Sequence, residues 1–231
     1  MGRPWGRTSW TVTRTPRRCF LTHARFLRVI SFQPGTAESA FDADLRETVV
    51  PRLADADGVV DLWVGRHGSR EDRARVLAST WRVDPEVEPG GPVDLAALQG
   101  LGNDVVAVDR VEQLPLSVHA RFERADPTRI LRVFHGQVRS GELERYVDLA
   151  RTGMLADSVA YDGLIAFALG TRAPDEFTTV SVWTGWPAIE AATGGNTRQP
   201  FMTRNAQLLE TFTVAHYEVL PDTRDKGPAR D

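Results

Sequence analysis

The stretch Phe-Leu-Arg-Val-Ile at residues 26–30 returns as Ile-Leu-Arg-Val-Phe at residues 130–134, with only its two end residues exchanged. Three further pairs of stretches match in the same order: Gly58–Gly65 with Gly163–Gly170, Val76–Trp81 with Thr178–Trp183, and Ala120–Glu123 with Ala215–Glu218. The offset between partners drifts, as changes in loop length would make it do. Four ordered matches therefore predict that one structural unit occurs twice in the chain.

Each copy follows the order strand, helix, strand, strand, helix, strand. The first strands, at residues 26–32 and 130–136, are short and rich in β-branched residues. In the first copy Pro51 is expected to kink or end the helix that follows. Short second helices are expected at Pro92 and Pro187, because proline fits the first turn of a helix. In the second copy the first helix is indicated by apolar residues at helical spacing: Leu143, Tyr146, Val147, Ala150, Met154 and Leu155.

This order is that of the split βαβ, or ferredoxin-like, unit. Its four-stranded antiparallel sheet carries helices on one face only, so the other face has to be covered. Two such sheets packed face to face would cover each other. We therefore predict an α+β fold of two ferredoxin-like repeats, residues 25–125 and 129–220, packed sheet to sheet. Because the chain already contains both halves, we expect a monomer or a homodimer.

Charge narrows the classes of partner. The net charge of the 231 residues is −3, and residues 1–37 hold seven arginines but no Asp or Glu, so the remainder is clearly acidic. An acidic globular part does not attract nucleic acid or anionic membranes by charge. Residues 1–24 are interpreted as a disordered arm or an over-extended gene start, and residues 221–231 as a polar tail.

Residue usage excludes several classes of site. Cys19 is the only cysteine, which excludes an intrachain disulfide, a redox CxxC motif and a zinc site built on a cysteine cluster. No spacing of histidines or carboxylates resembles a metal site. No run approaches the roughly 18 apolar residues of a membrane helix. Lys226 is the only lysine, an arginine bias typical of high-GC bacterial genes. We expect a bacterial, cytoplasmic protein.

The passage after Trp183 resembles a known family. Trp183 and the following residues 184–191, Thr-Gly-Trp-Pro-Ala-Ile-Glu-Ala, are similar to the Trp-x-Ser-x-x-Ala passage of the antibiotic-biosynthesis monooxygenase superfamily, with Gly185 in place of the serine. Residues 49–53 are similar to the end of that superfamily's first helix. The resemblance covers roughly residues 25–220 and implies a fused form of a dimeric α/β barrel. Members include cofactor-free oxygenases of polyketide aromatic rings, haem-degrading monooxygenases and proteins without an assigned reaction.

Haem is not the cofactor that the residues favour. The haem-degrading branch uses an Asn in the first strand, a Trp in the second helix and a later His. The corresponding positions here hold His135, Ala192 and Met202. Chlorite dismutase-like proteins, which also pair two ferredoxin-like halves, bind haem through a proximal histidine, a role for which His135 or His216 could be proposed. We expect no cofactor, with haem binding as a minor alternative.

Alternation along the strands selects candidate site residues. Ser181 and Trp183 share a face of their strand with Phe177 and Thr179, whereas Val180 and Val182 share the other. The uniformly aliphatic face is expected to meet the helices, so the mixed face would look into the barrel. Catalytic bases would be His135, whose counterpart is Ser31, and His216. The residues expected to bind substrate are Trp183, Ser181, Tyr217 and Asn196.

Structural roles are the alternatives for these residues. The histidines could bond to backbone or face solvent, Trp183 could be a core anchor, and Asn196 could belong to a surface loop. We expect a cofactor-independent monooxygenase acting on a hydrophobic or aromatic small molecule, in which a substrate carbanion activates oxygen. The rival is a non-catalytic small-molecule-binding or structural barrel. An enclosed cavity of about 300 Å³ or more, with converging polar groups, would favour an enzyme or a binder over a filled barrel.

Overall fold

The computed structural model describes residues 19–21, 23–34, 38–67, 73–82, 107–122, 129–156, 161–201 and 203–220. Residues 1–18 of the expected arm, the tail, most of the first hairpin loop and the helix expected at Pro92 lie outside these residues. The end of the arm was wrongly expected to be disordered, because Cys19–Leu21 forms a strand that pairs with residues 120–122. The elements in chain order are β1 Cys19–Leu21, β2 Phe26–Gln33, α1 Glu38–Asp44, the π-helical turn η1 Leu45–Val49, α2 Val50–Ala54, β3 Val59–His67, β4 Arg75–Trp81, β5 Ala107–Phe122, β6 Ile130–Val138, α4 Leu143–Ala156, β7 Leu164–Arg172, β8 Glu176–Trp183, α5 Trp186–Ala192, α6 Thr203–Ala206 and β9 Leu209–Val219.

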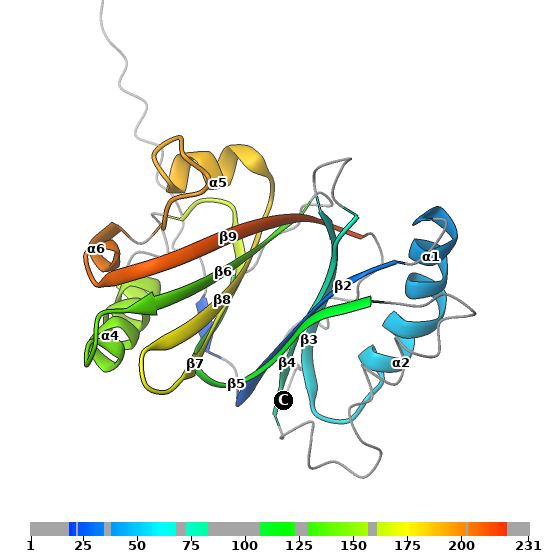
Figure 1. The fold of residues 1–231 in the computed structure, drawn as a ribbon, viewed down its shortest axis with the longest axis horizontal. Coiled ribbons are helices and arrows are strands. Elements are labelled where there is room, and N and C mark those ends of the chain that lie inside the picture. The colour runs from blue at the N-terminus through cyan, green and yellow to red at the C-terminus, as the bar shows by residue number, and fades with distance from the viewer. Residues whose placement is uncertain are drawn as a thin grey trace, which may run out of the picture.

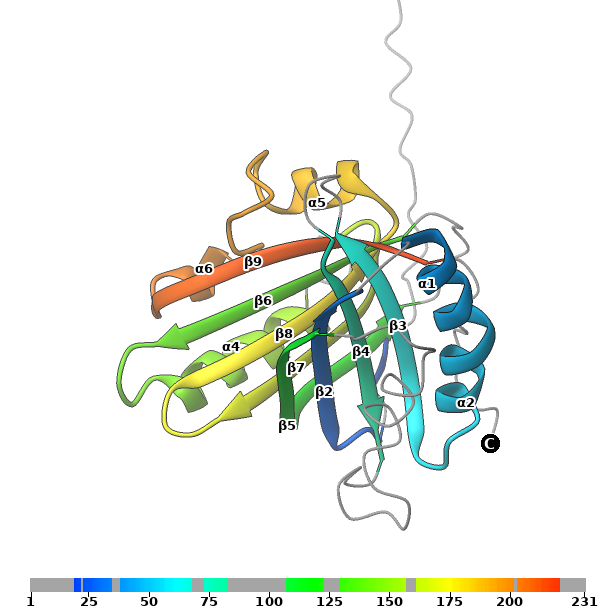
Figure 2. The same ribbon diagram turned by 45° about the vertical axis from the view of Figure 1, so that its right-hand side comes forward.

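The strands confirm two ferredoxin-like repeats. In the first repeat they lie in the order β5-β2-β4-β3, and in the second in the equivalent order β9-β6-β8-β7. Figure 1 shows α1 and α2 outside the first sheet, and α4, α5 and α6 around the second. The strands of the two sheets cross at an angle between these helical layers, as the turned view of Figure 2 shows. The fold is α+β, with the two sheets facing each other.

The two sheets are also joined along both edges, which closes them into a barrel. β3 pairs with β9, and β5 pairs with β7, so hydrogen bonds run around the whole ring. A glycine lies at each of these seams. A Cβ atom on Gly65 would lie 2.5 Å from Cβ of Tyr217, and one on Gly170 would lie 2.6 Å from Cβ of Leu114. Both glycines are therefore needed for the close approach of one repeat to the other.

Strand β5 is long because it serves both sheets. Its first part pairs with β2, ending at the pair Phe26 and Pro115, and its last part pairs with β7 after a bulge near Leu116. In the second repeat the residue opposite Ile130 on β9 is Glu218, so Pro115 corresponds to Glu218. The predicted match of Ala120–Glu123 with Ala215–Glu218 is therefore wrong in register. The end of β5 is an extension that pairs with the other repeat.

The first helical segment of each repeat follows its predicted pattern. In α4, Tyr146, Val147 and Ala150 are buried against the second sheet. In the first repeat, Pro51 lies in the first turn of α2, directly after the π-helical turn η1. That position needs no backbone N–H from proline, so the chain continues as helix and does not end there. Among the helices of the described ranges, none is long and apolar enough to cross a membrane.

The apolar core has three parts, and they show which strand faces point inward. One cluster lies under α4 and α5, a second lies under α1 and α2, and the third fills the barrel between the sheets. Val180 and Val182 belong to the barrel cluster, whereas Phe177 and Trp183 belong to the cluster under α4 and α5. The predicted orientation of β8 is thus reversed. The space between closely joined sheets suits short aliphatic side chains, and the helices leave room for large aromatic ones.

Candidate functional site

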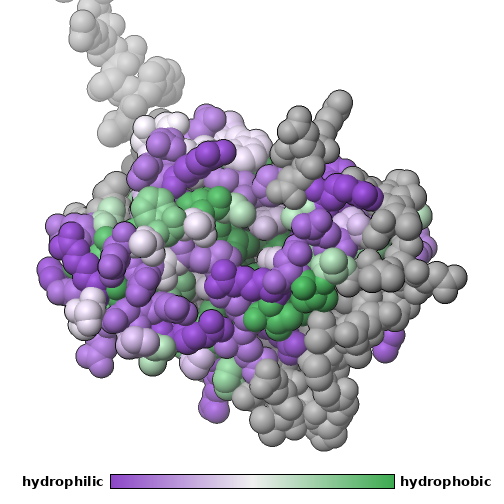
Figure 3. Space-filling model, viewed as in Figure 1, coloured by the Kyte–Doolittle hydropathy of each residue, from purple (hydrophilic) through white to green (hydrophobic). Residues whose placement is uncertain are grey.

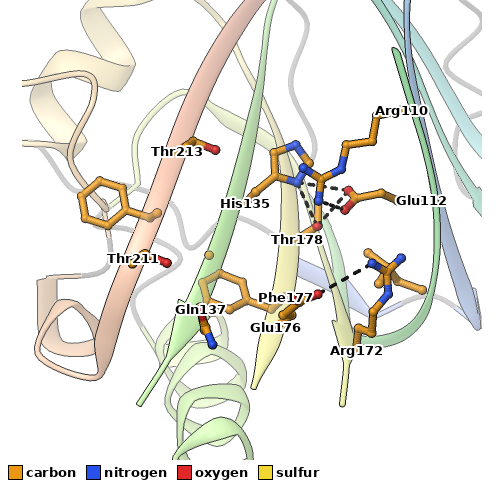
Figure 4. A pocket seen from close by; sticks show the side chains of 13 residues that line it. Arg110, Glu112, His135, Gln137, Arg172, Glu176, Phe177, Thr178, Thr211 and Thr213 are labelled. Carbon is orange, nitrogen blue, oxygen red and sulfur yellow. Dashed lines mark hydrogen bonds and ion pairs between the residues drawn. The ribbon is translucent and has the colours of Figure 1, made fainter. Parts of the chain in front are cut away.

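A cavity of about 230 Å³ opens at one end of the barrel. It lies over the second repeat, where β6 and β8 form its floor, and β9 and β5 stand on either side (Figure 4). The first repeat contributes β5 to its wall. The residues around it are Arg110, Glu112, Leu114, His135, Gly136, Gln137, Arg172, Glu176, Phe177, Thr178, Thr211, Phe212 and Thr213.

The most specific arrangement in this cavity is a carboxylate held against an imidazole. Nδ1 of His135 lies 3.1 Å from Oε2 of Glu112 and 3.1 Å from Oγ1 of Thr178. The Thr178 hydroxyl donates to Oε2 of Glu112 at 3.0 Å, so its oxygen can accept from the imidazole. Arg110 donates to Oε1 of the same carboxylate. Figure 4 shows the four side chains converging from β5, β6 and β8.

The electrostatics keep Glu112 ionised. Its side chain is only 3% exposed, and burial alone would raise the pKa. The hydrogen bond and charge of His135, together with the charge of Arg110, outweigh burial and lower the pKa of Glu112 to about 2. Because the carboxylate only accepts hydrogen bonds, it fixes the tautomer of neutral His135 with the proton on Nδ1. Nε2 then carries a lone pair and can act as a base toward a molecule in the cavity.

Among the sequence-predicted site residues, His135 is the one that lines this cavity. Its counterpart Ser31 faces the barrel on β2 but does not line the cavity. Tyr217 also faces the barrel, yet it lies deeper, buried against the apolar cluster that contains Leu131 and Val133. The cavity is open, and at about 230 Å³ it is smaller than the enclosed cavity that would favour an enzyme or a binder, because side chains fill the middle of the barrel.

The other sequence-predicted residues lie away from the cavity. Trp183 and Ser181 are buried on the helix side of β8, where the indole Nε1 donates to the serine Oγ at 2.9 Å. This orientation corrects the face assigned to them. His216 also faces the helix side, its ring 5.0 Å from that of Trp186. Asn196 is exposed in the loop after α5, where Oδ1 accepts from the backbone N–H of Arg198 at 3.1 Å.

Sequence reasoning missed Glu112, Arg110 and Thr178. The alternating run Arg110, Glu112 and Leu114 places a cation and a carboxylate on one face of β5, and this was the available signal. It was obscured by Pro115, because proline inside a run argues against a strand. The structure shows that Pro115 lies where β5 passes from one partner strand to the other.

A second carboxylate with the same kinds of donor lies at the other end of the barrel interior. Oδ2 of Asp61 accepts from Oγ1 of Thr80 at 3.2 Å and lies 2.8 Å from Nε2 of His119, and Oδ1 lies 2.9 Å from Nη1 of Arg121. The side chains of Asp61 and His119 are at most 2% exposed. Since this group is buried and internally paired, it fills that end of the barrel, whereas the Glu112 group faces a cavity.

Comparisons with solved structures address the fold. A candidate monooxygenase from Fusobacterium nucleatum aligns with a TM-score of 0.62 at 9% identity, over 85% of this chain and 93% of that one. One from Lactobacillus acidophilus aligns at 0.59 and 10% identity, with the same coverage. An anthrone oxidase-like protein aligns at 0.56 and 14% identity, over 88% and 94%. The fold is a fused dimeric α/β barrel. No family model and no curated protein matches the sequence.

Around His135 and His216, the described residues do not fit a haem group. Cavities that enclose drug-sized ligands measure about 300–1,000 Å³, and the cavity beside His135 is smaller than that range. Nε2 of His216 is buried against the helix-side core rather than open to a space. Within the described ranges, no three His, Cys, Asp or Glu side chains gather as they would to hold a metal ion.

Proposed function

We propose that the protein is a cofactor-independent monooxygenase, with the cavity at the barrel end as its active site and His135 as its general base. The observation that carries the proposal is the Glu112–His135 pair, whose imidazole lines the cavity. The likeness to monooxygenase structures supports the reaction class by analogy of fold. Glu112 is a positioning residue in this proposal, since it acts through His135 and stabilises the imidazolium form.

The chemistry that these residues can support begins with a methylene group made acidic by a neighbouring carbonyl. Nε2 of His135 removes one proton, and the electron pair of the carbanion passes to O2 as a C–O bond forms. The imidazolium returns its proton to the distal oxygen, giving a hydroperoxide. Removal of the second proton from that carbon then forms the C=O bond and breaks the O–O bond. The hydroxide released takes up a proton, so the methylene and O2 become a ketone and water without an external reductant.

Oxygen uptake with anthrone and with cyclohexane-1,3-dione tests this proposal, because both contain an activated methylene. Purified protein is expected to speed uptake, with the quinone or triketone and water as products. His135→Ala is expected to lower the rate by about 10²–10⁴-fold, the range typical of a lost general base. Glu112→Gln is expected to lower kcat while leaving KM nearly unchanged. His23→Ala, at an exposed histidine, is the matched control.

The competing function is a small-molecule binder without catalysis. The open form of the cavity is the observation that favours it, because an active site usually excludes water from the reacting group. Binding of either probe to the wild-type protein, with no oxygen uptake above that of His135→Ala, would support the binder and overturn the oxygenase.

A further inference from the structure

The lining of the cavity is more polar than a hydrophobic aromatic substrate requires. Thr211 and Thr213 direct hydroxyl groups into it from β9, and Gln137 lies near its edge (Figure 4). Apolar contacts come from Leu114, Phe177 and Phe212. A volume of about 230 Å³ also lies below the range that holds drug-sized ligands. Shape and polarity together favour a molecule of about one ring with polar groups on its periphery.

Two arginines lie at the cavity, and they differ in how tightly each is paired with a carboxylate. Arg110 is held by the buried carboxylate of Glu112. Arg172, at the end of β7, has Oε2 of Glu176 at 3.7 Å, with both side chains about half exposed. An exposed pair at that distance contributes little to stability, so the guanidinium can turn to another carboxylate with little loss. Planar guanidinium groups bind carboxylates through two parallel hydrogen bonds.

We propose that the natural ligand of this cavity is a small carboxylic acid, bound through its carboxylate to Arg172 while its acidic C–H or O–H group lies at Nε2 of His135. The proposal rests on the proposed function in taking the same cavity as the site. It replaces the hydrophobic substrate that the family resemblance implies with a polar one. Glu176 is the internal competitor of the ligand, since its carboxylate occupies the same guanidinium.

Most of the exposed hydrophobic side chains lie away from the cavity, so they do not point to a hydrophobic ligand there. On the face shown in Figure 3 they gather in two areas, with hydrophilic side chains around them. The large hydrophobic residues that are exposed in the described part of the chain are Val108, Val111, Trp186 and Phe212. Phe212 borders the cavity, and the others do not.

A matched pair of probes tests the proposal by isothermal titration calorimetry. The probes are 4-hydroxybenzoate and 4-hydroxybenzamide, which have the same size and ring but differ in charge. A charge-assisted hydrogen bond contributes about 1.5–3 kcal/mol, so the wild-type protein is expected to bind the acid about 10–100-fold more tightly than the amide. Arg172→Gln should abolish this preference, and Glu176→Gln should raise affinity for the acid. Arg145→Gln, at an exposed Arg–Glu pair on α4, should leave both affinities unchanged.

The two binding affinities decide whether the cavity recognises a carboxylate. Equal affinity for the two probes, a preference that survives in Arg172→Gln, or failure of both probes to bind would overturn the carboxylate assignment. Oxygen uptake is measured separately, so its outcome does not depend on this one. A preference that depends on Arg172, without oxygen uptake by any substrate, would keep the ligand class and refute the oxygenase.

Discussion

His216 should make the stability of this protein fall as the pH decreases below about 6.5. Its side chain lies on the helix side of β9, with Nε2 buried and without a hydrogen-bond partner among the described residues. Burial, and then the charges of Arg132, His67 and Arg198, lower the pKa of His216 to about 4, against a backbone hydrogen bond at Thr197 that raises it. The folded protein therefore keeps this imidazole neutral where the unfolded chain would protonate it.

Proton binding at His216 determines the direction and the size of the change in unfolding free energy with pH. Between pH 6.5 and 4 the unfolded chain binds a proton at this position and the folded protein does not, so stability is lost as the pH falls. For the two pKa values 6.5 and 4 the loss is about 2 kcal/mol at pH 5, relative to pH 7.5. Above pH 6.5 neither state is protonated, and this contribution no longer varies with pH.

Urea unfolding at pH 7.5 and pH 5 measures the effect. The wild-type protein should lose about 2 kcal/mol more on acidification than His216→Asn, which cannot take up the proton. Any stability that the substitution itself removes cancels, because each protein is compared with itself at two pH values. His23→Asn, at an exposed histidine, should behave like the wild type. If wild type and His216→Asn lose stability equally, within about 0.5 kcal/mol, burial of a neutral His216 is not the cause.

Three further perturbations test the fold and the site. Gly170→Ala should lower the free energy of unfolding, measured by denaturant titration, by about 1–3 kcal/mol, because the added Cβ meets Leu114. Gly153→Ala in α4, with open space around it, should raise that free energy by up to about 1 kcal/mol. Asp61→Asn should cost about 3–5 kcal/mol in the same assay, since it leaves the buried His119 and Arg121 without their carboxylate. Wild-type protein should lose stability as the pH falls from about 4.5 toward 2, where Glu112 becomes protonated, and Glu112→Gln should lack that component; equal acid profiles for the two would contradict a lowered pKa of Glu112.

Much of the fold could be predicted because both repeats need the same residue types at certain equivalent positions. The two strand-end tryptophans show this most directly. Trp81 and Trp183 each donate from Nε1 to the serine two residues earlier, both at 2.9 Å. Gly58 and Gly163, at the start of the equivalent strands β3 and β7, both have positive φ. Such positions constrain backbone and packing in the same way in each repeat, so the sequence pattern survives.

Alternation says which residues share a face, but it does not say which face is inside. On β8 both faces are buried, so the polarity of a face is a poor guide to its direction. Gly65 and Gly170 are the better guide to the face that points into the barrel. A Cβ atom at either position would meet a side chain of the other repeat, not of a helix. Glu112 was missed for a different reason: its importance depends on His135 and Thr178, which are far from it in sequence and adjacent only after the barrel closes.

Because the two repeats lie in one chain, the barrel can contain a single histidine–carboxylate pair. Two identical subunits related by symmetry would contain two such pairs. In the strand registers, the positions of His135, Thr178 and Glu112 correspond to Ser31, Val76 and Ala215. Two identical subunits would place a second histidine and a second carboxylate across the axis of the barrel, and with them a second pair of charges to be desolvated. A single gene holding both halves can instead keep one carboxylate, on β5 of the first repeat, and one histidine, on β6 of the second, with short neutral side chains at the related positions. The related positions Ser31 and Ala215 are then free to change without altering the acid–base pair.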